Sequence, residues 1–596
     1  MFRGPRYTNW MRFLRMLTNS LLAGVLGATY LTVLVLQLNP QIPLVSGTTW
    51  RWFLMLCLLY GVHLAVTFYV VIVVREFFTL RVLSPGWASV RVLAWMAASA
   101  AAVAAALMWL NVRGFNAALT EEAVWRMTAG AIATTASAAV LLGIAIAHYS
   151  FGRRGSRVGA TLFALAVFAS LALPLAARGR AVGLRAPIPA APEIQAGVAR
   201  GVPGPRVVML LLDGASFEYV LPRVAQGRLP GFARLLEKAA VMDLATVRPT
   251  QPDPVWAAVA TGMYPSKNGV RSAASYYARH DTRAVDLLPD HCFSNALVYL
   301  GFIRDLPNAA TTWRARPLWS IASQSGVRVG VARWPLTYPA EEVDGFIVSD
   351  RFHQLVGSIA EFDRAASPRA ILPGLGATFT EPTPGSEPQA VRHDPGGDPR
   401  GNTTPEASAL RRDRLYSRAM HDLSAEMKPR LSALRYDGLD AVGHYYLRYT
   451  QPRTFRGVPE EERRRFSQVI DRYYAFIDGE VGAALDGLAP GDLLMIVSGF
   501  GMQPVNPIKE TIGRLLGDAD FSGTHERAPD GFLIAYGAAA ETGRRQRGSI
   551  VDVTPTVLYF LGLPVARDMD GFARADLFTR AFTAERPIAF IPSYSH

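Results

Sequence analysis

The stretch RVVMLLLDGASF, Arg206–Phe217, decides the fold of this chain. It contains six consecutive apolar residues, Val207–Leu212, which lead directly into Asp213 and Gly214. A short and wholly apolar run predicts a strand that is buried on both faces, as in a parallel sheet. An acid at the carboxyl end of such a strand lies where open α/β sheets place their ligands. Asp213 is therefore a candidate site residue, and from this run alone a cap of the following turn is an equally good interpretation.

The composition divides the chain of 596 residues into a membrane part and a soluble part. A transmembrane helix needs roughly 20 apolar residues, and the first part holds about five such blocks. They lie near 16–37, 52–74, 91–112, 126–148 and 157–177. We therefore predict a transmembrane helical region over 1–180, a linker rich in Ala, Pro and Gly over 181–205, and a soluble domain over 206–596.

The arginines near the ends of these spans predict their orientation. Cytoplasmic loops carry an excess of Lys and Arg, and the Arg-rich segments here are the N-terminus and the second and fourth connections, with Arg3, Arg6, Arg12, Arg15, Arg75, Arg81, Arg91, Arg153, Arg154 and Arg157. This pattern predicts a multi-pass protein of the inner or plasma membrane with a cytoplasmic N-terminus and an extracytoplasmic, periplasmic C-terminal domain. Arg178, Arg180 and Arg185 run against the rule, because they follow the last span.

Charge and cysteine content limit the partners of the protein. The net charge is +13, but no Lys/Arg block is interleaved with aromatic residues as nucleic-acid binding requires. We expect no nucleic-acid partner, and attribute the basic charge to attraction to anionic lipid or to solubility. The two cysteines, Cys57 and Cys292, indicate no disulfide framework. The sequence does not indicate an oligomeric state.

A threonine in the soluble part is a candidate nucleophile. The turn PTQPDP, which begins at Pro249, leads into VWAAVATG, a predicted helix. Thr250 precedes that helix, and a hydroxyl at a helix N-terminus lies in the positive end of the helix dipole, where it can attack phosphorus. The alternative is a turn threonine that bonds its own backbone.

Several motifs of the soluble part occur in the order found in one known family. They are LLLDGAS (210–216), GRLPGFARL (227–235), PVWAAVATGMYPSKNG (254–269), VARWPLTYPAEEVDGFIVSDRF (331–352), YDGLDAVGHYY (436–446), LLMIVSGFGM (493–502), SGTHERAPDGFLIAYG (522–537) and SIVDVTPTVLYFLGLPVARDMDG (549–571). With these motifs the chain resembles the type I phosphodiesterase/nucleotide pyrophosphatase branch of the alkaline phosphatase superfamily. The resemblance covers 206–575 and does not extend to the membrane part.

The resemblance implies a fold and a metal centre. The fold is α/β, with an alkaline-phosphatase-like, mostly parallel central sheet flanked by helices, here preceded by an all-α bundle of about five transmembrane helices. Family members bind two divalent metal ions, commonly zinc. One ion would take Asp440, His444 and His525, and the spacing of Asp440 and His444 is one helical turn, so that both can face a single ion.

The second metal site departs from the family pattern. It would take Asp213, the nucleophile and an Asp-His pair, but Gly499 and Phe500 stand at the positions of that pair. A zinc ion with Asp213 as its remaining ligand would lack donors, so we predict one metal site and doubt the second.

The nucleophile position departs as well. The family's hydroxyl falls on Pro252, which leaves Thr250, two residues upstream, as the candidate. Asp253 is a possible supporting ligand or base, and Asn268 stands where many members have histidine.

The region 353–435 contains an insertion relative to the family. Its segment 374–408 is rich in Pro, Gly and Thr, which predicts a mobile loop or a partly disordered cap. His393 and Asp394 lie in this segment, where a solvated loop is the favoured interpretation. The following stretch, 463–488, has apolar residues at helical spacing and predicts one long amphipathic helix.

Two hypotheses for the function follow. The first is a membrane-anchored, extracytoplasmic phosphodiesterase or phosphotransferase that uses a divalent metal on phosphate esters, lipid- or glycan-linked ones being natural near a membrane. The second is a catalytically impaired family member that serves as a binding or assembly module in the cell envelope. A transporter is disfavoured because the spans contain almost no ionisable residue besides His63 and His148.

Overall fold

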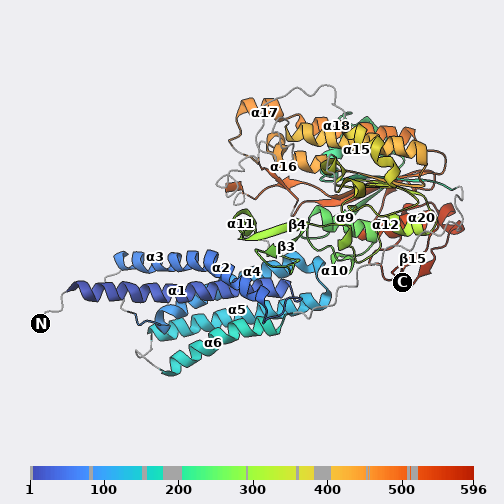
Figure 1. Cartoon of the computed structure of the whole chain (residues 1–596). Helices are drawn as coiled ribbons and strands as arrows, with labels where there is room; N and C mark the ends of the chain where they lie inside the picture. The colour runs from blue at the N-terminus through green and yellow to red at the C-terminus, as the bar shows by residue number, and fades with distance from the viewer. Residues whose placement is uncertain are drawn as a thin grey trace. The chain divides into compact units, whose positions relative to one another are not determined.

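The computed structural model divides the chain into two compact units. It describes residues 5–78, 85–150, 157–178, 204–289, 293–356, 361–380, 404–451, 454–455, 457–506, 510–511, 521–525 and 527–595. One unit consists of Met1–Leu184 with Ala274–Pro307, and the other of Arg185–Ala273 with Asn308–His596. Each unit is described separately below (Figure 1).

The first unit is mainly a bundle of long apolar helices. Its helices are α1 (Pro5–Leu38), α2 (Gly47–Leu56), α3 (Val62–Phe78), α4 (Val90–Phe115), α5 (Glu121–Ser150) and α6 (Arg157–Ala176), with a π-helical turn, Cys57–Gly61, joining α2 to α3. Five stretches are long and apolar enough to cross a membrane: Trp10–Leu38, Gly47–Glu76, Val90–Phe115, Glu121–Ala147 and Arg157–Ala176. The five predicted spans are confirmed as apolar helices of membrane-crossing length.

Small residues allow these helices to approach closely. Ala97, Ala101 and Ala104 of α4 are buried in one cluster with Tyr30 of α1 and Leu141 of α5. A side chain at Gly24 of α1 would come within 2.2 Å of the Gly61 carbonyl oxygen, so the helices touch there through backbone. Such contacts are typical of packing between transmembrane helices.

A segment from the middle of the chain belongs to this first unit. The strands β3 (Ala274–Ala278) and β4 (Ile303–Pro307) pair antiparallel and flank α11 (Phe293–Tyr299). Val285 and Leu288, between β3 and α11, are buried in one apolar cluster with Val35 of α1 and Trp52 of α2.

Asn39, buried at the end of α1, also binds this segment through hydrogen bonds. Its amide nitrogen donates to Leu287 O at 2.6 Å, and its oxygen accepts from the amides of Asp286 and Leu287 at 3.0 and 3.1 Å. The division of the chain into 1–180, 181–205 and 206–596 stays a prediction. Within 206–596, the segment Ala274–Pro307 is grouped with the helices, because these contacts bury it against them.

The second unit is built on a ten-stranded, mostly parallel sheet. In spatial order its strands are β13, β2, β12, β9, β1, β8, β5, β6 and β7, and β14 also pairs with β2. Their bounds are β1 (Val207–Leu212), β2 (Ala240–Ala245), β5 (Val329–Ala332), β6 (Gly345–Val348), β7 (Ala366–Ser367), β8 (Leu431–Tyr436), β9 (Leu493–Phe500), β12 (Asp530–Tyr536), β13 (Gly543–Arg544) and β14 (Gly548–Ser549).

The predicted central strand is confirmed, since β1 is buried and pairs in parallel with both β8 and β9. The antiparallel strand β12 follows β9 in the sheet. This mixed, mostly parallel sheet is the expected α/β fold.

Helices cover both faces of the sheet (Figure 1). One face carries α8 (Pro230–Glu237), α15 (Pro405–Met427), α16 (Gly438–Thr450) and α18 (Val469–Asp486), and the other carries α9 (Pro252–Thr261), α12 (Leu318–Gln324) and α20 (Val553–Leu561). Among the described residues, the other α-helices and strands of this unit are α7 (Phe217–Ala225), α10 (Pro265–Asn268), α13 (Phe352–Leu355), α14 (Leu372–Thr380), α17 (Glu460–Phe466), α21 (Arg580–Glu585), β10 (Gln503–Pro504), β11 (Gly523–Thr524), β15 (Val565–Ala566) and β16 (Phe590–Ile591).

Two local expectations differ from the structure. The single helix expected over 463–488 is divided into α17 and α18, which are separated at Ser467 and Gln468. Part of the expected loop 374–408 is helical, because α14 extends to Thr380 and α15 begins at Pro405, where the Thr404 hydroxyl caps it by accepting from the Ala407 amide. Residues 381–403, with His393 and Asp394, lie outside the described residues.

Candidate metal centre

The site is built where the parallel strands β1 and β8 end side by side. Asp213 follows β1, and its amide donates to the carbonyl of Tyr436, the last residue of β8, at 3.0 Å. The helix α16 begins two residues later and carries Asp440 over this edge of the sheet. Gly214 permits the close approach: its φ is +72°, and a side chain there would lie 3.1 Å from the Asp440 Cα.

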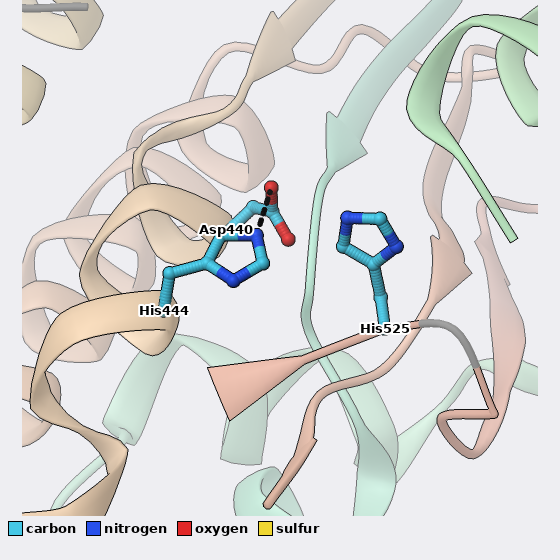
Figure 2. Close-up of side chains that lie close together, drawn as sticks. All are labelled: Asp440, His444 and His525. Atoms are coloured by element: carbon cyan, nitrogen blue, oxygen red, sulfur yellow. Dashed lines mark ion pairs between the residues drawn. The ribbon is translucent and has the colours of Figure 1, made fainter. Parts of the chain in front are cut away.

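Three side chains converge on one point beside this edge. Asp440 and His444 project from successive turns of α16, and His525 follows β11 and faces them from the opposite side (Figure 2). One ligand atom from each residue lies within 4.8 Å of the others. Among the described residues, these three form the one group of His, Cys, Asp or Glu side chains that lie close enough together to hold a metal ion.

Backbone carbonyls orient both histidines. The Nδ1 of His444 lies 2.7 Å from Gly523 O, and the Nδ1 of His525 lies 2.7 Å from Thr250 O. A carbonyl can only accept, so each Nδ1 carries the proton and the lone pair is on Nε2, the tautomer of a metal-bound histidine.

The carboxylate of the cluster is also suited to a ligand. Asp440 Oδ2 lies 3.4 Å from His444 Nε2, and its Oδ1 is buried without a hydrogen-bond partner among the described residues. A buried and unpaired carboxylate oxygen is unfavourable unless a cation binds it. One carboxylate and two imidazoles form a donor set of three ligands that fits catalytic zinc.

Asp213 lies next to this cluster, but its oxygens are engaged elsewhere. Arg435 of β8 donates to Asp213 through Nε at 3.0 Å and through Nη2 at 2.5 Å, and Trp256 of α9 donates through Nε1 at 2.7 Å. Burial raises the pKa of Asp213 to about 6, and Arg435 opposes that rise, so the ion pair is charged at neutral pH. Arg435, which sequence reasoning missed, was visible as the one cation in the apolar strand LSALRY.

At the other positions where the resemblance implies a second metal site or its nucleophile, the residues present serve packing or helix geometry. Gly499 of β9 has no side chain, and a methyl group there would lie 2.5 Å from Val255 Cγ1 of α9. Phe500 is fully buried, with its ring centroid 5.0 Å from that of His525. Pro252 is the first residue of α9, a position that suits proline because no helical partner is needed for its nitrogen.

The structure also places the three remaining candidate residues. Thr250 is buried, and its hydroxyl donates to Val247 O at 3.0 Å while its carbonyl binds His525. Asp253 accepts from the Asn308 amide at 3.1 Å, and burial raises its pKa to about 6.

Asn268 closes a turn. Its side chain donates to Met263 O at 2.8 Å and accepts from the Val270 amide at 2.9 Å.

Of the candidate site residues, the structure brings Asp440, His444 and His525 together as a ligand group. The Thr250 carbonyl contacts this group by accepting a hydrogen bond from His525.

The packing around Gly499 makes a testable prediction. We expect Gly499→Ala to destabilise the protein by about 1–3 kcal/mol, because the added methyl group overlaps the stiff Val255 side chain. Gly479→Ala is the matched control: this position in α18 has open space around it, and alanine there favours the helix by about 0.5–1 kcal/mol. Urea unfolding of the detergent-solubilised chain, followed by tryptophan fluorescence, measures both. Unchanged stability in Gly499→Ala would show that the position has room for a side chain.

Comparison with known proteins places this geometry in a family. The model of the type I phosphodiesterase / nucleotide pyrophosphatase family matches residues 207–553. Among solved structures, murine ectonucleotide pyrophosphatase / phosphodiesterase 5 matches with 12% identity and a TM-score of 0.38, over 63% of this chain and 100% of that one. An inactive variant of the same murine protein in complex with AMP matches with 11% identity, a TM-score of 0.38 and the same coverage. A search of curated proteins finds no match. Because the family model covers more than half of the sequence, the chain belongs to the type I phosphodiesterase/nucleotide pyrophosphatase family.

Proposed function

We propose that this protein is a membrane-anchored phosphodiesterase or phosphotransferase that acts on phosphate esters with a single divalent metal ion, zinc by its donor set. The observation that carries the proposal is the intact ligand group, in which two backbone carbonyls hold His444 and His525 in the ligand tautomer beside Asp440. Membership of the family supports phosphate esters as the substrate class.

The bound ion would polarise a phosphate oxygen and stabilise the charge that develops in phosphoryl transfer. Thr250 is the proposed nucleophile, because its backbone is tied to the ligand His525 and it precedes the N-terminus of α9. Its hydroxyl donates to Val247 O, so attack requires rotation of the side chain away from that carbonyl. Asp253, next to Pro252 at the helix start, is the proposed supporting base.

The membrane part makes lipid- or glycan-linked phosphates the proposed substrates. Five apolar helices precede the α/β unit, and the Arg-rich connections of the bundle favour a cytoplasmic N-terminus. The catalytic unit then lies outside the cytoplasm, in the periplasm, where esters attached to the membrane surface are accessible to it.

A specific set of observations favours a second candidate, a non-catalytic binding module of the cell envelope. Pro252 supplies no hydroxyl, the Thr250 hydroxyl is already bonded, and Gly499 and Phe500 supply no ligands. In this case the protein would bind the metal and a phosphate ester but would not hydrolyse the ester.

Hydrolysis by the full chain in detergent separates the two candidates. With zinc or manganese we expect cleavage of bis(4-nitrophenyl) phosphate, and a loss on the order of 100-fold or more in Asp440→Ala, because the ligand set is incomplete. Thr250→Val should lose activity while retaining metal. The matched control is His421→Ala, which removes an exposed histidine from α15. A folded, metal-loaded protein without hydrolysis would overturn the enzyme proposal in favour of the binding module.

Labelling of single cysteines tests the orientation. In a chain with Cys57→Ala and Cys292→Ala, we expect a membrane-impermeant maleimide to label Phe572→Cys on spheroplasts, since Phe572 is 75% exposed in the α/β unit. Trp10→Cys, 66% exposed at the start of the first span, should be labelled only after lysis. The reverse pattern would contradict a cytoplasmic N-terminus.

A further inference from the structure

We infer that this chain has one metal site where its family resemblance implies two, and that the Arg435 guanidinium is the fixed cation at the second position, where it binds the phosphate group of the substrate. The inference rests on the proposal that this site takes phosphate esters. It adds a phosphate-binding residue, and with it a physical reason for the preference for phosphodiesters that the family name implies.

The residues around Asp213 do not fit a second metal ion. Both Asp213 oxygens accept hydrogen bonds from Arg435, and Oδ1 accepts a further one from Trp256. A metal at Asp213 would have to displace a guanidinium that is bound through two parallel hydrogen bonds, the strongest geometry for an arginine–carboxylate pair. The backbone around Gly499 is closed by Val255, and the buried Phe500 offers no donor.

Arg435 has the position and the charge to replace the missing ion. Although burial opposes it, the Asp213 carboxylate raises the pKa of the guanidinium, which therefore stays positive at any physiological pH. The charge of Arg435 also acts on other acids. Burial raises the pKa of Asp437, but Arg333 and Arg435 outweigh it and lower that pKa to about 2. Burial likewise raises the pKa of Asp253 and of Asp350, and Arg435 opposes part of that rise. The charge of Arg435 thus acts on several carboxylates near the site, together with Arg333 in the case of Asp437.

Of the two side chains in the ion pair, only that of Arg435 is accessible to solvent. The Asp213 side chain is fully buried, whereas that of Arg435 is 10% exposed. Its Nε and Nη2 are bound to Asp213, and Nη1 has no hydrogen bond to the described residues. Nη1 is therefore the guanidinium nitrogen that remains to donate to an oxyanion, for which guanidinium is the preferred protein partner.

The ion pair and the metal cluster are neighbours. Asp213 is followed by Gly214, which lies against the backbone of Asp440, and the charge of Arg435 acts on the Asp440 carboxyl group. A phosphate group bound to an ion at Asp440 would therefore be within reach of the positive charge of Arg435 from β8.

The exchange of a metal for arginine selects among phosphate esters. A guanidinium carries one positive charge less than a divalent ion, so the site stabilises less negative charge than a two-metal site. A phosphodiester carries a single negative charge, and a phosphomonoester at neutral pH carries nearly two. We expect the site to favour phosphodiesters.

Binding of non-hydrolysed probes to the zinc-loaded full chain tests this inference by calorimetry, without activity as the readout. We expect diphenyl phosphate to bind more tightly than phenyl phosphate. We further expect Arg435→Met to weaken diphenyl phosphate binding by at least about tenfold, with zinc content unchanged. Arg328→Met is the control, because Arg328 forms an exposed ion pair with Asp344 before β5.

A second variant keeps the test decisive if Arg435→Met fails to fold. The double variant Asp213→Asn with Arg435→Gln removes both charges of the pair, so no buried charge is left uncompensated. It should keep zinc and lose diphenyl phosphate binding. Wild-type affinity in a folded Arg435 variant, or tighter binding of phenyl phosphate by the wild type, would overturn the inference. Binding that depends on Arg435 in a protein that hydrolyses nothing would support it and overturn only the enzyme proposal.

Discussion

The buried ion pair between Asp213 and Arg435 is the interaction on which the rest of the site depends. It joins the ends of β1 and β8, the two central parallel strands, through two hydrogen bonds. Loss of one partner of such a pair leaves an uncompensated buried charge and costs about 3–5 kcal/mol. The pair therefore ties the chemistry of the site to the stability of the sheet, and it also fixes which cations the site can accept.

Neighbouring packing is arranged around the same pair. Trp256 donates to Asp213 from α9, and its own carbonyl accepts from the Trp334 indole at 3.2 Å. The absence of a side chain at Gly499 lets α9 approach β9 closely enough to place Trp256 there. The metal cluster adjoins the pair through the close contact of Gly214, the residue after Asp213, with Asp440, and the carbonyls of Gly523 and Thr250 orient its two histidines. The ligand geometry of Asp440, His444 and His525 is thus present, while side chains fill the neighbouring positions at Asp213, Gly499 and Phe500.

The sequence predicts the parts of this arrangement that are local. The apolar run of β1, the five spans and the helical spacing of Asp440 and His444 all depend on neighbours within a few turns, and each is present in the structure. The motif order also identified His525, which no local pattern would connect to α16. The same motif order predicts that Gly499 and Phe500 stand where the resemblance implies two metal ligands.

Other features depend on partners distant in sequence and were not predictable in this way. The role of Arg435 follows from strand register, which brings it beside Asp213 from more than two hundred residues away. The segment Ala274–Pro307 has an ordinary soluble composition, and its place with the helical bundle is fixed by Asn39 and by apolar contacts with Val35 and Trp52. The direction of the Thr250 hydroxyl is likewise set by the turn that it closes on Val247.

The number of metal ions bound per chain tests the central claim most directly. Elemental analysis of the purified full chain, saturated with zinc and freed of excess, should give one zinc ion per chain. That ion should be lost in Asp440→Ala and retained in Asp213→Asn, because Asp213 binds Arg435 and holds no metal. Two zinc ions per chain, one of them lost in Asp213→Asn, would contradict the account.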